Sequence, residues 1–338
     1  MQSVSGVSMA SGNHQRGTLH RKLAGWLVAW LVCLAAPVLA QDDVVHDART
    51  WLSRLAPAQQ ATSYRGVFVY ARGDQVSSLK VVRRVQEGRI RERLVPQDGG
   101  AGEILRNDEA VHCVLPRQGH FLLEGAIPSG PFSDAFPAQR EAMNQWYRPV
   151  RLEDDRIAGY ATAVIDLPAR DAWRYSYRLW LELNTALLVK SQVLEANGEV
   201  LERFQFSSLE ITDQIADDEL KGRLIPDQVK APTAEAPHAE HALYEAWTPG
   251  WLPPGFTQTA DGDRRAYSDG LASFSIFVEP QSGMDMPEGA SRIGATTVYM
   301  RHWTSDGTSL RVTVVGEVPP ATAMKVAEGV RLSVRERQ

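Results

Sequence analysis

Cysteine is scarce in this sequence, which has only Cys33 and Cys113 among its 338 residues. Cys33 lies in an N-terminal segment that we expect to be removed, so Cys113 is left alone and an intramolecular disulfide is excluded. A lone thiol within an apolar stretch such as 111–115 is usually a small buried hydrophobe. A reactive or dimer-forming thiol is the alternative that the residues leave open.

The short motifs that carry catalysis are also missing. The sequence has no G-x-S-x-G turn, no G-x-x-x-x-G-K phosphate loop and no G-x-G-x-x-G, and neither C-x-x-C nor H-E-x-x-H. His112 and Cys113 are adjacent on an expected strand, so their side chains point to opposite faces and cannot form a nucleophile pair. His238 and His241 have no third metal ligand nearby. Carboxylate pairs drawn from distant positions stay open, but we expect no enzyme, no metal site and no cofactor.

Apolar runs long enough to span a membrane are absent, and the one sizeable run lies near the N-terminus. Arg21 and Lys22 precede it, residues 23–36 are apolar, and a small-residue end follows at Ala40. The run has about 14 residues, against the roughly 20 of a spanning helix. This order of basic, apolar and small residues predicts a signal peptide over 1–40, cleavage before Gln41 and export from the cytoplasm.

Positive charge is not in excess either. The first 40 residues hold three of the 36 Lys and Arg and none of the 41 Asp and Glu, so their removal leaves a net charge of −8. A general nucleic-acid binder needs a basic domain, and this class is therefore excluded. The remaining length of about 300 residues indicates two domains.

The pattern of the first domain, expected over 41–212, is that of an antiparallel β-sheet with packed helices. Helices are predicted over 43–55, ended by Pro57, and over 137–147. Turn residues separate short runs of alternating β-type residues, and spacings this short favour antiparallel pairing. Strands are predicted at 64–70, 76–85, 89–95, 103–106, 110–115, 120–123, 156–167, 174–183, 187–195 and 200–211.

A change in composition separates this domain from a second one. Residues 213–241 are acidic and then rich in Pro and Ala, with no apolar periodicity, and they predict a linker without a buried face. The second, smaller α+β domain is expected over 242–333. Its predicted strands are at 273–279, 296–303 and 309–315, and Pro319 begins a predicted helix that ends near Val330.

Two surface features rise above the background. Strand periodicity places Arg89, Arg91 and Arg93 on one face of the first sheet, with Ile90 and Leu94 on the other. In an acidic protein such a basic stripe is a candidate site for anionic partners, either lipid phosphates or an acidic stretch of a protein. An ordinary solvated face is the alternative.

The second feature is a set of apolar side chains that recur at spacing two, the period of one strand face. They are candidates for lining a cleft that holds an acyl chain. The alternative is a packed core. The set consists of Phe68, Tyr70, Leu79, Val81, Tyr177, Leu179, Phe204 and Phe206.

Several strings of strand residues, in this order along the chain, resemble the RseB/MucB family of periplasmic regulators of the envelope-stress sigma factor (sigma-E or AlgU). The string Tyr64-Arg-Gly-Val-Phe-Val-Tyr70 opens the series, and Trp251-Leu-Pro-Pro-Gly-Phe256 belongs to its second half. The others are residues 91–94, 103–106, 175–181, 187–191, 204–210 and 319–330. The resemblance covers almost all of the chain after the signal peptide.

The resemblance implies more than the composition does. It implies a periplasmic protein whose first domain is an open β-barrel like the lipoprotein carriers LolA and LolB. Such a protein binds the periplasmic part of a membrane-bound anti-sigma factor of the RseA or MucA kind and protects it from the site-1 protease. Lipopolysaccharide or a related lipid would release it. A lipid or lipoprotein carrier without an anti-sigma partner is the second hypothesis, but a plain carrier would end near residue 212.

Overall fold

The computed structural model describes residues 37–99, 102–108, 110–115, 119–124, 145–223, 247–260, 264–280, 287–305 and 308–332. The chain divides into two compact units, residues 1–44 and 45–338, and both large β-sheets belong to the second unit. Three expected segments lie outside the described residues: most of the signal peptide (1–36), most of the second helix (137–144) and much of the linker (224–241).

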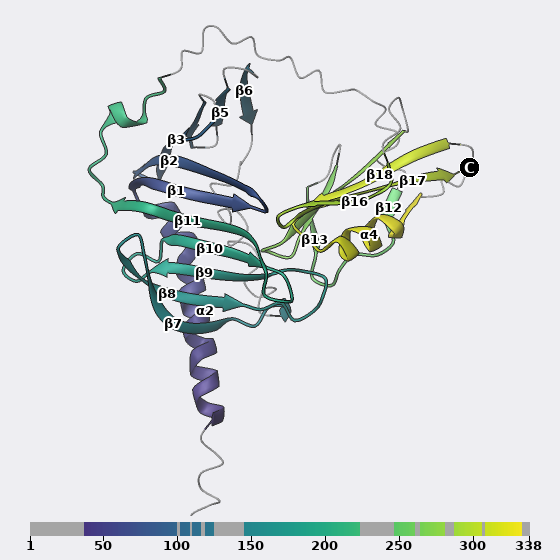
Figure 1. The fold of residues 1–338 in the computed structure, drawn as a ribbon, viewed down its shortest axis with the longest axis horizontal. Helices are drawn as coiled ribbons and strands as arrows, with labels where there is room; N and C mark the ends of the chain where they lie inside the picture. Colours follow the sequence, from purple (N-terminus) through teal and green to yellow (C-terminus); the bar gives the residue numbers. More distant parts are fainter. Residues whose placement is uncertain are drawn as a thin grey trace, which may run out of the picture. The chain divides into compact units, whose positions relative to one another are not determined.

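The larger sheet has eleven strands in the order β6-β5-β4-β3-β2-β1-β11-β10-β9-β8-β7 (Figure 1). All neighbours are antiparallel, as the short spacings predicted. The strands are β1 Tyr64–Arg72, β2 Gln75–Gln86, β3 Arg89–Pro96, β4 Glu103–Asn107, β5 Ala110–Leu115, β6 Gly119–Glu124, β7 Val150–Ile157, β8 Tyr160–Leu167, β9 Ser176–Glu182, β10 Leu188–Leu194 and β11 Val200–Ile211.

One predicted strand is wrong. Residues 156–167, expected as a single strand, contain the turn of the β7–β8 hairpin. Ala158 and Gly159 connect the two strands with φ angles of 47° and 88°. Two consecutive residues with positive φ match the twist of a tight hairpin, and glycine adopts this conformation without strain. The alternating pattern continues through the turn, which is why periodicity alone missed it.

Helix α2 (Pro37–Ala61) is longer than the predicted helix, because Pro57 lies inside it and does not end it. The last turn is held by hydrogen bonds that the sequence does not reveal. Arg83 donates to the Gln59 carbonyl at 2.6 Å, and the Thr62 amide donates to Ala58 at 3.0 Å. A cation at the C-terminal carbonyls stabilises a helix end. Within the described residues, no helix combines the length and apolarity that a membrane span requires.

The helix packs across the part of the sheet formed by β8, β9 and β10 (Figure 1). Ala48, Trp51, Leu52 and Leu55 face a buried cluster to which each of these strands contributes. This helix face is the one that the spacing of its apolar residues predicted. Its burial accounts for the position of α2 on the sheet.

The smaller sheet has six strands in the order β13-β14-β15-β18-β17-β16, and β12 and β19 form a separate pair. Helix α4 (Pro320–Gly329) packs on this part of the chain through Ala323, Val326 and Ala327. Three of the strands were predicted, whereas β13, β14 and β16 are short and were missed. The bounds are β12 Trp247–Pro249, β13 Thr257–Ala260, β14 Arg265–Ser268, β15 Ser273–Pro280, β16 Gly289–Ile293, β17 Thr296–Ser305, β18 Thr308–Gly316 and β19 Val330–Leu332.

The first part of the expected linker, residues 213–223, packs on the larger sheet and contains the short 3-10 helix η1 (Asp217–Leu220). Ile215 and Leu220 are buried together with Val82 of β2. The expectation that 213–241 has no buried face is therefore wrong for residues 213–223. Two isolated apolar residues among charges have no helical or strand period, so the pattern did not reveal them.

Candidate functional site

The eight apolar residues proposed to line a cleft have their side chains on one face of the larger sheet. Phe68 lies opposite both Phe206 and Leu79, and Tyr70 lies opposite Phe204. Directly opposed residues of an antiparallel pair share a face. The same reasoning carries the face across β10 to β9, because Ser191 is opposite both Phe204 and Leu179.

This apolar face is partly filled by the protein itself. Tyr177 and Leu179 are fully buried in the cluster that α2 covers. Val81, Phe204 and Phe206 are buried in a second cluster, where Phe204 and Phe206 contact each other edge to face at 5.4 Å between ring centres. Phe68, Tyr70 and Leu79 are only half-buried. A packed core thus explains five of the eight, and a ligand on this face would meet the other three.

A polar cluster lies beside Tyr70. The Tyr70 hydroxyl donates to the carboxylate of Glu202, which also accepts the amide of Ala295 at 3.0 Å. Glu317 lies in the same cluster, and burial raises its pKa from 4.5 to about 7, with the nearby charge of Glu202 adding to the effect and Arg72 opposing it. The cluster joins the ends of β1 and β11 to the β16–β17 turn and to the end of β18. No spacing in the sequence suggested it.

The raised pKa of Glu317 makes stability depend on pH. The folded protein holds this proton more tightly than the unfolded chain, so the free energy of unfolding falls as the pH rises from about 4.5 to about 7. We expect Glu317→Gln to flatten this part of the profile, by about 1–3 kcal/mol between pH 5 and pH 8. Urea denaturation at pH 5 and pH 8 measures this difference in the free energy of unfolding. Glu199→Gln, on an exposed turn, is the control; equal slopes in the two variants would contradict the assignment.

A buried ion pair joins the segment before β9 to the turn after β14. The guanidinium of Arg174 contacts the carboxylate of Asp269, and neither side chain is exposed to solvent. The same carboxylate accepts from the Tyr147 hydroxyl at 3.0 Å and from the amides of Leu271 and Ala272 at 2.9 and 2.8 Å. Arg174 is separated from Asp269 by 95 positions, so no local pattern could have found the pair.

The string Trp251–Phe256 supplies further contacts at this junction. The carbonyl of Pro254 accepts a hydrogen bond from Arg174 at 2.5 Å, and the ring of Phe256 lies 5.2 Å from the guanidinium carbon. Gly255 has a φ of +87°, and a Cβ there would overlap the indole of Trp146. The family resemblance drew attention to this string, and the structure places it where the two sheets meet within one compact unit.

The three arginines of the basic stripe differ in their surroundings. Arg89 is exposed, but Arg91 forms an ion pair with Asp217 at 2.9 Å, and Arg93 is buried in an ion pair with Glu103. Ile90 and Leu94 do lie on the opposite face, because they pair with Val85 and Val81. The candidate site for anionic partners at Arg89, Arg91 and Arg93 therefore stays a proposal, with Arg89 its most exposed member. The protein's own acidic residues already neutralise two of them.

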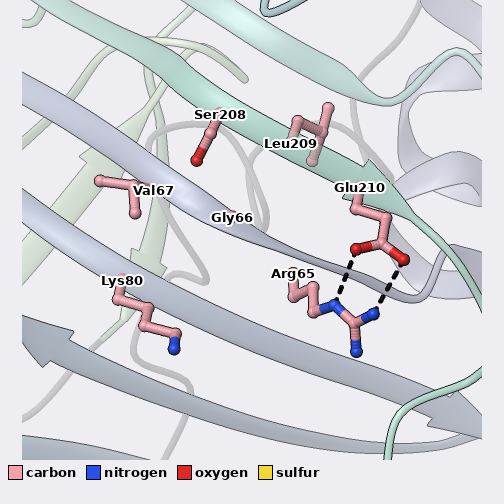
Figure 2. A pocket seen from close by; sticks show the side chains of 7 residues that line it. All are labelled: Arg65, Gly66, Val67, Lys80, Ser208, Leu209 and Glu210. Carbon is pink, nitrogen blue, oxygen red and sulfur yellow. Dashed lines mark hydrogen bonds and ion pairs between the residues drawn. The ribbon is translucent and has the colours of Figure 1, made fainter.

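A shallow depression of about 320 Å³ lies near the stripe, over β2, β1 and β11 (Figure 2). It is lined by Arg65, Gly66, Val67, Lys80, Ser208, Leu209 and Glu210. Arg65 and Glu210 form a two-point ion pair across its rim, with distances of 2.9 and 2.8 Å (Figure 2). A Cβ at Gly66 would overlap the Ser208 carbonyl. Glycine therefore allows β1 to approach β11 closely at this point.

The described residues do not bring together three or more His, Cys, Asp or Glu side chains in a group that could hold a metal ion. The arrangement offers candidate binding surfaces and one buried polar cluster. The candidate surfaces are the half-buried part of the apolar face and the charged surface around Arg65 and Arg91, and the buried cluster is the one at Glu202.

Both parts of the chain match models of one protein family. The sequence matches the model of the MucB/RseB N-terminal domain over residues 47–224 and that of the MucB/RseB C-terminal domain over residues 241–331. It is 35% identical over 313 residues to the sigma factor AlgU regulatory protein MucB of Pseudomonas aeruginosa, covering 89% of this chain and 96% of that protein. It is 27% identical over 331 residues to the sigma-E factor regulatory protein RseB of Escherichia coli K12, covering 92% and 99%.

Solved structures of MucB are also similar to this chain. The complex of Pseudomonas aeruginosa MucA and MucB matches with a TM-score of 0.70 and 32% identity, over 85% of this chain and 99% of that one. A crystal structure of MucB in complex with MucA(peri) matches with a TM-score of 0.67, over the same shares of the two chains.

Proposed function

The chain belongs to the MucB/RseB family, as its strings of strand residues predicted, and we propose that it binds the periplasmic part of a membrane anti-sigma factor and protects it from site-1 proteolysis. The observation that carries the proposal is its similarity to MucB bound to MucA over nearly the whole of that MucB chain. The protein would act by covering a cleavable segment, without chemistry of its own.

The finer parts of the proposal concern location, release and shape. The basic, apolar and small-residue order of the first 40 residues supports export to the periplasm. A lipid such as lipopolysaccharide would lower partner occupancy if it bound the partner-free form better. Phe68, Tyr70 and Leu79, the half-buried part of the apolar face, are the proposed acyl contacts. The antiparallel sheet with α2 packed on one face supports an open barrel of the lipoprotein-carrier kind.

The proposal is tested by mixing the mature protein, the periplasmic domain of an anti-sigma factor and the site-1 protease. At saturating protein we expect cleavage to slow by at least about tenfold, because protection follows occupancy. A dissociation constant near 1 μM corresponds to about −8 kcal/mol and requires protein at several micromolar for high occupancy. Addition of lipopolysaccharide should restore cleavage.

The alternative is a periplasmic lipid or lipoprotein carrier without an anti-sigma partner, and the same assay separates the two. If cleavage proceeds at its free rate with saturating protein, the regulatory function is wrong. Binding of lipid by the protein alone would then favour the carrier. The carrier hypothesis gives no role to residues 247–332, which contain the smaller sheet, the β12–β19 pair and α4.

A further inference from the structure

The outward face of β1, β2 and β3, opposite the apolar face, carries a group of cations. Arg84 lies directly opposite Arg91, and Val82 lies directly opposite both Arg65 and Arg93, so the side chains of all five share this face. We call Arg65, Arg84, Arg91 and Arg93 the basic face. One of the four, Arg65, also lines the depression in Figure 2.

An acidic segment of the same chain occupies the basic face. Asp217 accepts from Arg84 at 2.6 Å and from Arg91 at 2.9 Å, and Glu219 accepts from Arg65 at 3.2 Å. The pKa of Asp217 is lowered chiefly by the hydrogen bond from Arg84. Asp218, between them, points to solvent with 88% of its side chain exposed and pairs only with Lys221 in the described residues. Alternate carboxylates thus face the arginines.

The basic face contacts the main chain and the apolar side chains of this segment as well as its carboxylates. Arg84 donates to the Ile215 carbonyl at 3.0 Å and Arg65 to the Gln214 carbonyl at 3.4 Å. Ile215 and Leu220, on either side of the carboxylates, are buried against Val82. A phosphate or a lipid headgroup offers neither main-chain carbonyls nor flanking apolar side chains at this spacing. The site therefore favours an acidic peptide.

We propose that the basic face is a binding site for an acidic peptide segment of a partner, and that residues 213–223 are its resident occupant. The expected partner segment has two carboxylates two residues apart, with an apolar residue two positions before the first and one position after the second. This inference rests on the proposed function and deepens it, because it names the chemistry of one partner segment. Ion pairs at a half-exposed surface contribute little net stability and are screened by salt, so such an occupant can be exchanged.

Covalent attachment gives the resident segment an effective concentration that reaches the millimolar range for short flexible connections. A partner peptide binds well only when the resident segment is weakened or when a second contact holds the partner nearby. Displacement would also release residues 213–223 from the sheet.

The test uses the full mature chain and a fluorescent peptide with the sequence of residues 213–223. In the variant Asp217→Asn/Glu219→Gln we expect the peptide to bind at least about tenfold more tightly than it binds the unsubstituted protein, because the competing segment is weakened. Adding Arg84→Gln and Arg91→Gln should abolish the gain. Asp218→Asn removes the same charge from an exposed position and should leave affinity within twofold. Arg89→Gln is the matched control on β3.

Hydrogen exchange provides a readout that does not depend on the variants. Saturating peptide should increase exchange of the amides of residues 213–223 in the unsubstituted protein, which a purely structural segment would not show. Equal peptide affinity for the Asp217→Asn/Glu219→Gln variant and the unsubstituted protein would overturn the proposal. Equal competition by millimolar inorganic phosphate or by anionic vesicles would also overturn it, in favour of a general anion site.

A second arm measures binding of an anti-sigma periplasmic domain to the same variants. If this domain does not bind the unsubstituted protein, the proposed function fails. If it binds all variants equally while the peptide does not bind, the proposed function stands and the inference about the basic face is wrong.

Discussion

Replacement of Arg174 by Met will lower the free energy of unfolding by about 3–5 kcal/mol, the cost of leaving one member of a buried ion pair without its partner. Asp269 is fully buried, and without Arg174 its carboxylate retains the Tyr147 hydroxyl and two backbone amides but no cation. Urea denaturation of the mature protein, followed by circular dichroism, measures the loss.

The control for this prediction is Arg178→Met, four residues along the chain. Arg178 pairs with Asp166 at 2.8 Å, but the two side chains are 36% and 23% exposed. Partly exposed pairs contribute about 0–1 kcal/mol. The double variant Arg174→Met/Asp269→Asn removes both charges and should regain part of the loss. If Arg174→Met and Arg178→Met cost the same, the buried pair has no special role at this junction.

Substitution of Gly255 by Ala will destabilise the protein by about 2–5 kcal/mol, from backbone strain of about 1–2 kcal/mol and overpacking of about 1–3 kcal/mol. Gly255 has a φ of +87°, in the region that disfavours a Cβ, and the added methyl group would overlap the ring of Trp146. The shift in the denaturation midpoint measures the effect. Because Trp146 precedes the larger sheet's β7 and Gly255 precedes the smaller sheet's β13, the change acts where the two sheets meet.

Gly159→Ala separates the two contributions. Gly159 has a φ of +88° but no atom within 4 Å of an added Cβ, so it reports backbone strain alone. We expect it to cost about 1–2 kcal/mol. A loss at Gly255 no greater than that at Gly159 would show that the Trp146 contact does not restrict the junction.

The strands of the larger sheet were predictable because alternation is a local property. In β1 and β11, the residues that face the apolar clusters recur every second position, and the structure pairs Phe68 with Phe206 and Tyr70 with Phe204. The same alternation failed at Ala158 and Gly159, where the chain reverses without interrupting the pattern. Alternation therefore predicted strands of the larger sheet well. It was weakest at the β7–β8 turn, where a single glycine is the only signal in the sequence.

The candidate sites were less predictable than the elements. Periodicity correctly placed Arg91 and Arg93 on the face opposite Leu94, yet it could not show that Asp217 and Glu103 already neutralise them. Glu103 follows Arg93 by ten positions and Asp217 follows Arg91 by 126. An ion pair depends on which strand and which segment become neighbours, and a one-dimensional pattern carries no such information.

The sequence by itself determined the N-terminal signal pattern, the acidic balance, the antiparallel strands and, through ordered strings of residues, the family. Each of these depends on composition or on residues close together in the chain. Only the tertiary structure decided that Arg174 meets Asp269, that Glu202 and Glu317 share a buried cluster, and that residues 213–223 cover the basic face. These contacts exist because burying the apolar surfaces of the sheets and helices brings distant polar groups together, and those groups must then find partners away from water.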